Sequence, residues 1–168
     1  MGEPELTAEL DSEPAFNARA AHFARALQAA RIWPLVFGLR GDLGSGKTTW
    51  ARAMLRGLGH GGRVPSPTYT LLEHYTVGDL AVVHLDLYRL RGDAELENLG
   101  VRDWLAETAR WLLVEWPERA PQLAQQCDLT LEFAVTSSGG RRLTATARTR
   151  PGIEALSSLR RGVFNNDP

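Results

Sequence analysis

The stretch that decides the fold is Gly41-Asp42-Leu43-Gly44-Ser45-Gly46-Lys47-Thr48, which matches the pattern Gly-x-x-x-x-Gly-Lys-(Ser/Thr) of a phosphate-binding loop, or P-loop. Its glycines allow a sharp turn that brings successive backbone N–H groups close to a polyphosphate. The lysine of this pattern reaches the outer phosphates, and the hydroxyl after it binds Mg²⁺. We therefore predict a nucleotide-phosphate site over residues 41–49, including Thr49.

The flanking segments have the composition that a P-loop requires. Residues 32–39 form an apolar run typical of a buried strand. Residues 49–58 place apolar side chains at helical spacing, and Gly59 follows as a plausible C-terminal cap. Lys47 is also the only lysine among the nineteen Lys and Arg residues, which fits a compact point charge used for a phosphate. Strand, loop and helix together favour a nucleotide site over an ordinary glycine-rich turn.

The composition excludes several classes of protein. With 168 residues, 43% hydrophobic and 23% charged, the chain is predicted to fold as one domain over residues 1–168. It has no apolar stretch long enough for a membrane span, and its acidic start is unlike a signal peptide. Cys127 is the single cysteine, so no internal disulfide can form. A net charge of −1 argues against a broad nucleic-acid-binding face. We expect a cytoplasmic protein without a membrane or disulfide partner.

A polar loop and a hairpin follow the P-loop helix. Residues 59–69 contain three glycines and two prolines, and hydroxyls at Ser66, Thr68 and Thr70 are candidates to meet a γ-phosphate, Mg²⁺ or water. Residues 70–77 and 80–87 are β-rich runs on either side of a turn signal. In the second run His84, Asp86 and Tyr88 share one face. Asp86, at the end of that run, is well placed to act beside the phosphates, whereas a structural role is favoured for His84.

The second acidic candidate is Glu115. It ends the run Trp111-Leu112-Leu113-Val114-Glu115, whose continuous apolar character is typical of a central parallel strand. This carboxylate is the better candidate for the Walker B acid, which holds Mg²⁺ or its waters. We therefore predict a metal site made by Thr48 and Glu115.

The two ends of the chain carry weaker signals. Residues 1–11 read as a loose or locally paired segment, and Ser12 is a candidate N-cap of a helix that runs to about residue 30. Residues 129–135 and 143–147 read as a hairpin, followed by a short helix over 153–159. We find no chemistry in this part of the sequence. Residues 141–168 carry six arginines and are predicted to form either a solvated rim or a docking surface for an acidic partner or RNA. Within them, residues 150–168 are predicted to be a basic C-terminal extension.

Four blocks of the sequence resemble the TsaE (YjeE) family, the small P-loop ATPases of bacterial tRNA threonylcarbamoyladenosine synthesis. They are Gly-Asp-Leu-Gly-Ser-Gly-Lys-Thr-Thr at 41–49, Val-Pro-Ser-Pro-Thr-Tyr-Thr-Leu at 64–71, His-Leu-Asp-Leu-Tyr-Arg-Leu at 84–90, and Val-Glu-Trp-Pro-Glu at 114–118. Only the first block is general to P-loop proteins. The resemblance spans residues 12–148 and implies an α/β, P-loop NTPase-like three-layer fold with a mixed central sheet and hairpins.

The resemblance also implies an activity and its residues. ATP would bind the 41–49 loop with Trp116 beside it, and Mg²⁺ would be held by Thr48 and Glu115. Residues 66–70 would act as a switch, and Asp86 would support hydrolysis. Similar proteins hydrolyse ATP while bound to the synthase subunits TsaD and TsaB, and they meet tRNA only through that complex.

Two features depart from the family pattern. The family's threonine-rich start of the first helix, which helps to hold the base, is Glu13-Pro14-Ala15-Phe16-Asn17 here, so no base contact is predicted. The arginine-rich segment after residue 149 lies outside the pattern.

Three functions remain open from the residues alone. A partner-driven Mg-ATPase would use Lys47 for the phosphates and Asp86 or a residue such as Thr68 to orient water, with a transition-state arginine from Arg89 or from a partner. A small-molecule or nucleoside kinase would use Asp86 as base for a substrate hydroxyl. A non-enzymatic nucleotide switch is the third. The ATPase is preferred on the resemblance.

Overall fold

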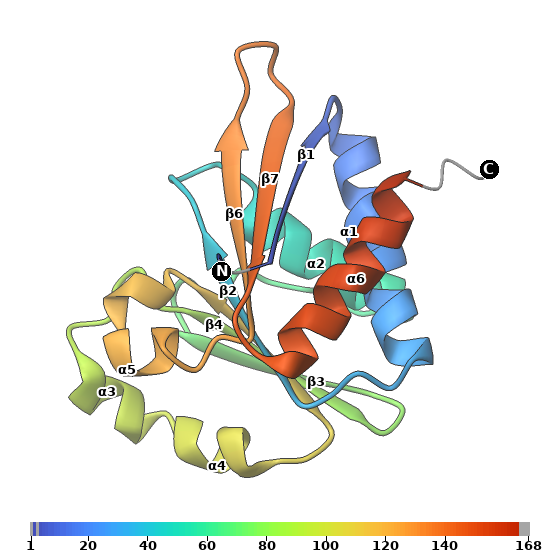
Figure 1. The fold of residues 1–168 in the computed structure, drawn as a ribbon. Helices are drawn as coiled ribbons and strands as arrows, with labels where there is room; N and C mark the ends of the chain where they lie inside the picture. The colour runs from blue at the N-terminus through green and yellow to red at the C-terminus, as the bar shows by residue number, and fades with distance from the viewer. Residues whose placement is uncertain (1, 3, 165–168) are drawn as a thin grey trace.

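The computed structural model describes residue 2 and residues 4–164, and these form a seven-stranded mixed sheet with helices on both faces (Figure 1). The strands are β1 (Glu5–Leu10), β2 (Leu35–Arg40), β3 (Leu72–Val77), β4 (Leu80–Asp86), β5 (Arg110–Glu115), β6 (Leu129–Val135) and β7 (Arg141–Ala147). The helices are α1 (Glu13–Ala29), α2 (Lys47–Gly57), α3 (Asp93–Asn98), α4 (Val101–Ala106), α5 (Pro121–Ala124) and α6 (Arg150–Phe164), with a 3-10 turn η1 (Pro117–Arg119).

The sheet is parallel at its centre and antiparallel at its edges. Its strand order is β1-β7-β6-β2-β5-β4-β3, with β2 parallel to both β5 and β6, and β4 parallel to β5. Every residue of β5 is buried, as expected for a strand covered on both faces. The register pairs Leu39 with Glu115 and Glu115 with Asp86. The carboxyl ends of three central strands therefore meet at one edge, where α/β sheets bind ligands.

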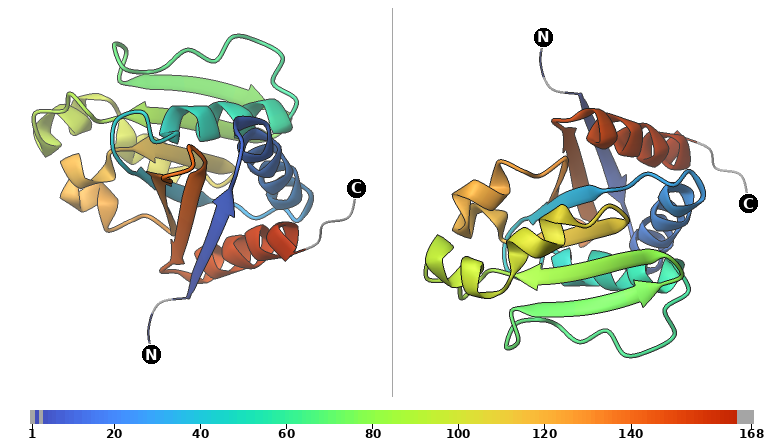
Figure 2. Two further views of the ribbon diagram at one scale, coloured as in Figure 1. Left: turned by 90° about the horizontal axis from the view of Figure 1, so that it is seen from above. Right: turned by 90° about the horizontal axis from the view of Figure 1, so that it is seen from below.

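Two hydrophobic cores make the fold three-layered, as the sequence predicted. Phe37 of β2 packs in a core with α1, α2 and α6, whereas its neighbour Val36 packs in a second core with α3, α4 and α5. Figure 2 shows α1 and α6 on one side of the sheet and α3, α4 and α5 on the other. Alternate residues of the central strands thus serve opposite cores. No helix within residues 4–164 is long and apolar enough to cross a bilayer.

Helix α1 forms as its pattern predicted. The Ser12 side chain accepts a hydrogen bond from the backbone N–H of Ala15, which caps the helix. The apolar stripe of this helix is buried: Phe16, Ala20, Phe23 and Leu27. Helix α1 packs closely on α2, since a Cβ added at Gly57 would overlap the backbone of Ala21. This packing holds the P-loop helix against the sheet.

Residues 1–11 were predicted to be loose or locally paired, but Glu5–Leu10 form a strand whose partner is distant in the sequence. These residues form β1, which pairs antiparallel with β7 from Glu5↔Thr146 to Leu10↔Arg141. Leu6 and Leu10 are buried, while Glu5, Thr7 and Glu9 are exposed. The acidic composition hid this alternation, and the partner strand lies at the far end of the sequence.

The C-terminal segment is also more ordered than predicted. The helix expected over 153–159 runs from Arg150 to Phe164. It can begin before Pro151 because the first turn of a helix does not need the N–H that proline lacks. The Thr149 hydroxyl accepts a hydrogen bond from the N–H of Gly152 and so caps this helix. Its apolar residues Ala155, Leu156 and Leu159 are buried in the first core. The expected basic extension is therefore a packed helix, and residues 165–168 lie outside the described part of the chain.

Candidate functional site

The P-loop connects β2 to α2, as the sequence predicted. Gly41 and Gly46 have φ angles of 137° and 115°, which residues with a side chain rarely adopt. A Cβ at Gly41 would overlap the carbonyl oxygen of Phe133, and one at Gly46 would lie 3.0 Å from the Phe16 ring. Both glycines are therefore required by the close approach of β6 and α1 to the loop.

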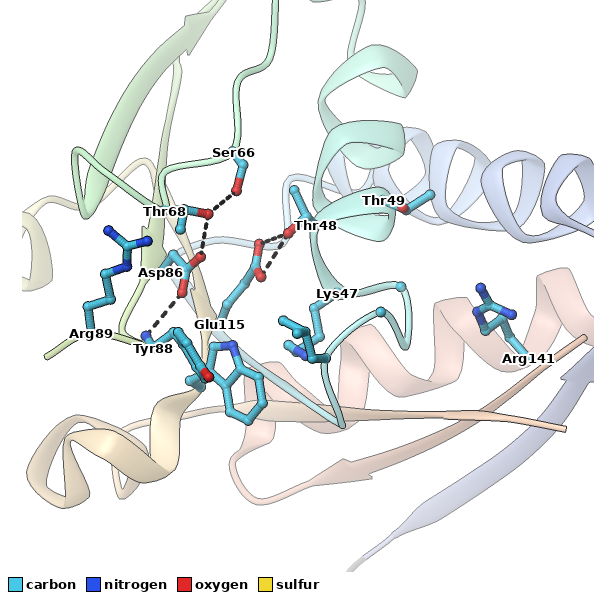
Figure 3. A pocket seen from close by; sticks show the side chains of 14 residues that line it. Lys47, Thr48, Thr49, Ser66, Thr68, Asp86, Tyr88, Arg89, Glu115 and Arg141 are labelled. Atoms are coloured by element: carbon cyan, nitrogen blue, oxygen red, sulfur yellow. Dashed lines mark hydrogen bonds between the residues drawn. The ribbon is translucent and has the colours of Figure 1, made fainter.

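A cleft with a volume of about 420 Å³ opens beside this loop (Figure 3). Six of the nine predicted loop residues line it: Leu43, Gly44, Gly46, Lys47, Thr48 and Thr49. Gly41, Asp42 and Ser45 lie behind the lining, where the Asp42 carbonyl accepts a hydrogen bond from the Ser45 N–H. The remaining lining comes from the ends of β4 and β5, the 66–70 loop and the start of β7.

Lys47 is buried at the floor of the cleft, with 4% of its surface exposed. Its ammonium donates to the carbonyl oxygens of Gly41 and Asp42 at 2.6 and 2.8 Å and lies 4.1 Å from the centre of the Trp116 ring. Burial lowers the pKa of this ammonium, and the nearby carboxylates, Glu115 first, oppose that shift. An ammonium has three N–H donors, so one remains for a ligand in the cleft.

The predicted metal ligands lie side by side. The Thr48 hydroxyl is 2.8 and 2.9 Å from the two carboxylate oxygens of Glu115, which is 2% exposed. Within the described residues no three His, Cys, Asp or Glu side chains are grouped to hold a metal by themselves. Mg²⁺ does not need such a group, because it usually takes one or two carboxylate or hydroxyl oxygens and completes its shell with phosphate and water. These oxygens therefore fit Mg²⁺ bound together with a polyphosphate.

Asp86 lies beside Glu115 and is 5% exposed. One of its carboxylate oxygens accepts the N–H of Tyr88 at 3.0 Å, and the other accepts the Thr68 hydroxyl at 3.3 Å. Burial raises the pKa of this carboxyl, and the Tyr88 hydrogen bond only partly opposes the shift. A fixed carboxylate with a raised pKa in a cleft is suited to accept a proton or to orient a water molecule.

The 66–70 loop contributes two of its three predicted hydroxyls. Ser66 and Thr68 line the cleft, and their hydroxyl oxygens are 2.6 Å apart. Thr70 was predicted beside them, but its hydroxyl donates to Glu73 instead, and it does not line the cleft. The chain from Ser66 through Thr68 to Asp86 thus forms one hydrogen-bonded wall.

Two arginines lie at opposite ends of the cleft in the view of Figure 3. Arg89, after β4, is exposed and stacks its guanidinium 4.7 Å from the ring centre of Tyr69. Arg141, at the start of β7, donates to the carbonyls of Gly139 and Gly140 at 3.2 Å each. No functional role was predicted for Arg141 from the sequence, because only the sheet topology brings the β6–β7 hairpin to the P-loop.

A second, smaller cavity of about 100 Å³ shares Gly46, Thr49 and Arg141 with the main cleft. Its other walls are the start of α1, at Ser12, Glu13 and Phe16, and the turn of the β6–β7 hairpin. The first helix therefore reaches the P-loop although it lacks the threonine-rich pattern.

A mixed α/β sheet with a P-loop after one central strand and a buried acid at the end of the next defines the P-loop NTPase-like class of proteins. The family model described as "Threonylcarbamoyl adenosine biosynthesis protein TsaE" matches residues 10–143, and the chain belongs to this family. The family takes part in the synthesis of threonylcarbamoyladenosine in tRNA. The resemblance seen in four sequence blocks is thereby confirmed.

Similarity to individual proteins supports the membership in this family. A TsaE protein of Haemophilus influenzae is 40% identical over 121 residues, which cover 72% of this chain and 75% of that protein. A TsaE protein of Treponema pallidum is 30% identical over 131 residues, covering 72% and 96%. The crystal structure of YdiB from Bacillus subtilis has the same fold, with a TM-score of 0.71 and 23% identity over 96% of this chain and 97% of that one.

Proposed function

We propose that this chain is a Mg²⁺-dependent ATPase that hydrolyses ATP in complex with TsaD and TsaB and so supports threonylcarbamoyladenosine modification of tRNA. The observation that carries the proposal is the hydrogen-bonded pair of Thr48 and Glu115 beneath the P-loop, with Asp86 on the adjacent strand. One arrangement thus combines a phosphate cradle, two oxygens for a cation and a separate carboxylate for the attacking water.

The cradle and the cation site account for ATP binding. The N–H groups at the start of α2 and the remaining donor of Lys47 face the phosphates. Thr48 and Glu115 would hold Mg²⁺, which neutralises charge on the phosphate oxygens. Trp116 covers Lys47 from one side and limits the access of water to its ammonium.

Hydrolysis needs a water aligned with the outer phosphate and a group that accepts its proton. Asp86 is the best-placed group, because the Tyr88 N–H and the Thr68 hydroxyl fix its two oxygens. Thr68 contributes to catalysis by holding that carboxylate and by offering its own oxygen to the water. The Ser66–Thr68 contact lets the loop respond to the phosphate as a unit.

The smaller cavity is the place for the adenine base. It adjoins the P-loop exit through Gly46 and Thr49, and α1 supplies its outer wall. Phe16 offers an apolar surface there, and Arg141 stands between the base and phosphate regions.

The partner requirement is supported by family membership and by the cleft itself. Its rim exposes apolar and aromatic groups, with Leu43 79% and Tyr69 83% exposed. A partner that covers this rim would exclude water and place charge near the phosphates. Arg89, held on Tyr69 in this structure, would move with the loop or give way to an arginine from the partner.

Phosphate release from Mg-ATP tests the proposal. We expect slow release by the purified protein, faster release with TsaD and TsaB, and loss of both rates in Glu115→Gln. Glu107→Gln is the matched control, because Glu107 is exposed after α4 and does not line the cleft.

The alternative activity is a kinase that transfers the phosphate to a small molecule or nucleoside, with Asp86 as base for the acceptor hydroxyl. Release that is indifferent to TsaD and TsaB but rises with a hydroxyl-bearing acceptor would replace the ATPase by this kinase. Release that is unchanged in Glu115→Gln would refute both.

A further inference from the structure

His84 is a fully buried histidine beneath the P-loop helix. It lies on β4 two residues before Asp86, with 0% of its surface exposed, and faces the same side of the sheet as Val82. Its Nε2 atom is 2.7 Å from Oε1 of Glu115. Its Nδ1 atom is buried and has no hydrogen-bond partner within the described residues. The ring is therefore anchored by a single polar contact, and that contact is to a predicted metal ligand.

The direction of this hydrogen bond follows from its partner. An ionised carboxylate only accepts hydrogen bonds, so Nε2 of His84 carries the proton in the contact with Glu115. Oε1 of Glu115 accepts from Nε2 and also lies within reach of the Thr48 hydroxyl at 2.8 Å. Oε2 has the Thr48 hydroxyl as its only partner, at 2.9 Å. The Thr48 hydroxyl has one proton for the two oxygens, whereas Nε2 of His84 donates to Oε1 alone, so Oε2 keeps more free acceptor capacity.

We propose that His84 is a positioning residue that fixes the rotation of the Glu115 carboxylate, so that Oε2 is the oxygen offered to Mg²⁺ or to its bound water. This inference rests on the proposed Mg²⁺ site. A carboxylate held only by the Thr48 hydroxyl could rotate about its last bond and exchange its two oxygens, whereas a second donor, Nε2 of His84, on Oε1 makes them unequal. A structural role for His84 is favoured by the sequence alone, whereas its hydrogen bond to Glu115 assigns the buried ring to the orientation of that carboxylate.

The position of His84 argues against a purely packing role. Its register partner on β5 is Leu113, and both Leu113 and Val82 are fully buried apolar residues of the same core. An apolar side chain at position 84 would continue this core without burying an unpartnered nitrogen. The imidazole is therefore best explained by its hydrogen bond to Glu115.

Three variants test the inference. His84→Leu removes the donor but keeps an apolar side chain of similar volume. His84→Gln keeps a donor nitrogen that can reach Glu115, and His84→Asn keeps the same amide on a side chain too short to reach it. His74→Gln is the control, because His74 is exposed on β3 and contacts Trp104 instead.

The main measurement is the affinity for a fluorescent ADP analogue with EDTA and with increasing Mg²⁺, together with the melting temperature of each variant. We expect all four variants to bind the analogue alike in EDTA. His84→Leu and His84→Asn should raise the half-saturating Mg²⁺ concentration by about tenfold or more, as for other residues that orient metal ligands. His84→Gln should stay within about threefold of the parent, and His74→Gln should not differ from it.

The outcomes separate the inference from the proposed function. If the parent protein binds the analogue equally well with and without Mg²⁺, the proposed metal site fails. If the parent needs Mg²⁺ but His84→Asn and His84→Gln have the same Mg²⁺ dependence, His84 is a packing residue and the inference is wrong. His84→Asn and His84→Gln still test the positioning role if His84→Leu does not fold, because these two variants carry the same amide and differ only in side-chain length.

Discussion

The hydroxyl of Thr48 lies 2.8 and 2.9 Å from the two carboxylate oxygens of Glu115, although the residues are 67 positions apart in the chain. Thr48 lies in the first turn of the P-loop helix, and Glu115 ends a strand that pairs with the strand before the P-loop. The contact therefore depends on the register of β2 and β5, and it makes the sheet itself part of the site.

Replacing Thr48 separates the role of its hydroxyl from that of its size. Thr48→Val should lower Mg²⁺-dependent phosphate release by at least about tenfold, because it removes both a cation ligand and a donor to Glu115. Thr48→Ser keeps the hydroxyl and should retain most of the activity. Equal rates for the two variants would contradict the assignment of Thr48.

Asp86→Asn should reduce phosphate release by about 100-fold or more, because an amide cannot accept the proton of the attacking water. Binding of ADP should change little, since Asp86 belongs to the wall opposite the P-loop lysine in Figure 3. Asp79→Asn, in the exposed turn before β4, is the matched control. If Asp86→Asn releases phosphate as fast as the parent protein, another group must accept the proton of the attacking water.

The carboxyl group of Asp86 should lower the stability of the fold at neutral pH. Burial raises the pKa of Asp86 above its value in the unfolded chain, so the folded state holds this proton more tightly. The free energy of unfolding must then decrease as the pH rises from the unfolded to the folded pKa. We expect Asp86→Asn to raise the melting temperature at pH 7, with a smaller gain near pH 4. A lower melting temperature of Asp86→Asn than of the parent protein at pH 7 would contradict a raised pKa of Asp86 in the folded state.

Gly152 is a position where one methyl group should destabilise the fold. A Cβ there would overlap the carbonyl oxygen of Asp128, which accepts the N–H of Arg148 and cannot move freely. Gly152→Ala should cost about 1–3 kcal/mol of unfolding free energy, as for other overpacked sites. Gly61→Ala, where a Cβ would meet nothing within 4 Å, should be close to neutral. Urea denaturation of both variants measures the difference.

Cys127 should resist thiol reagents in the folded protein. It is 1% exposed, and burial raises the pKa of its thiol to about 12, so very little thiolate is present at pH 8. We expect no reaction with a chromogenic disulfide over minutes and one full equivalent after denaturation. Rapid labelling of the folded protein would show that the second core opens readily.

The sequence predicted the parts of the fold that carry local signals. The P-loop, its flanking strand and helix, the Ser12 cap and the central strand ending in Glu115 all depend on residues within about ten positions of each other. The sequence placed Asp86 and Glu115 separately at strand ends near the phosphates, and their direct pairing across β4 and β5 is seen only in the structure.

The missed features all depend on contacts between distant segments. Strand β1 needs β7 as its partner, and α6 extends because α1 and the sheet bury its apolar face. Arg141 reaches the cleft only through the position of the β6–β7 hairpin. The contact of His84 with Glu115 depends on how β4 and β5 are aligned. No local pattern encodes these relationships.

The pairing of β1 with β7 has a consequence for how the chain folds during its synthesis. Residues 5–10 leave the ribosome long before their hydrogen-bonding partners at 141–147 are made. Closing so long a loop is slow compared with forming local helices and hairpins. Until then β1 has no partner strand, and the first core lacks both Leu6 and the apolar face of α6. The sheet edge formed by β1 should thus be completed last, after the central strands have formed.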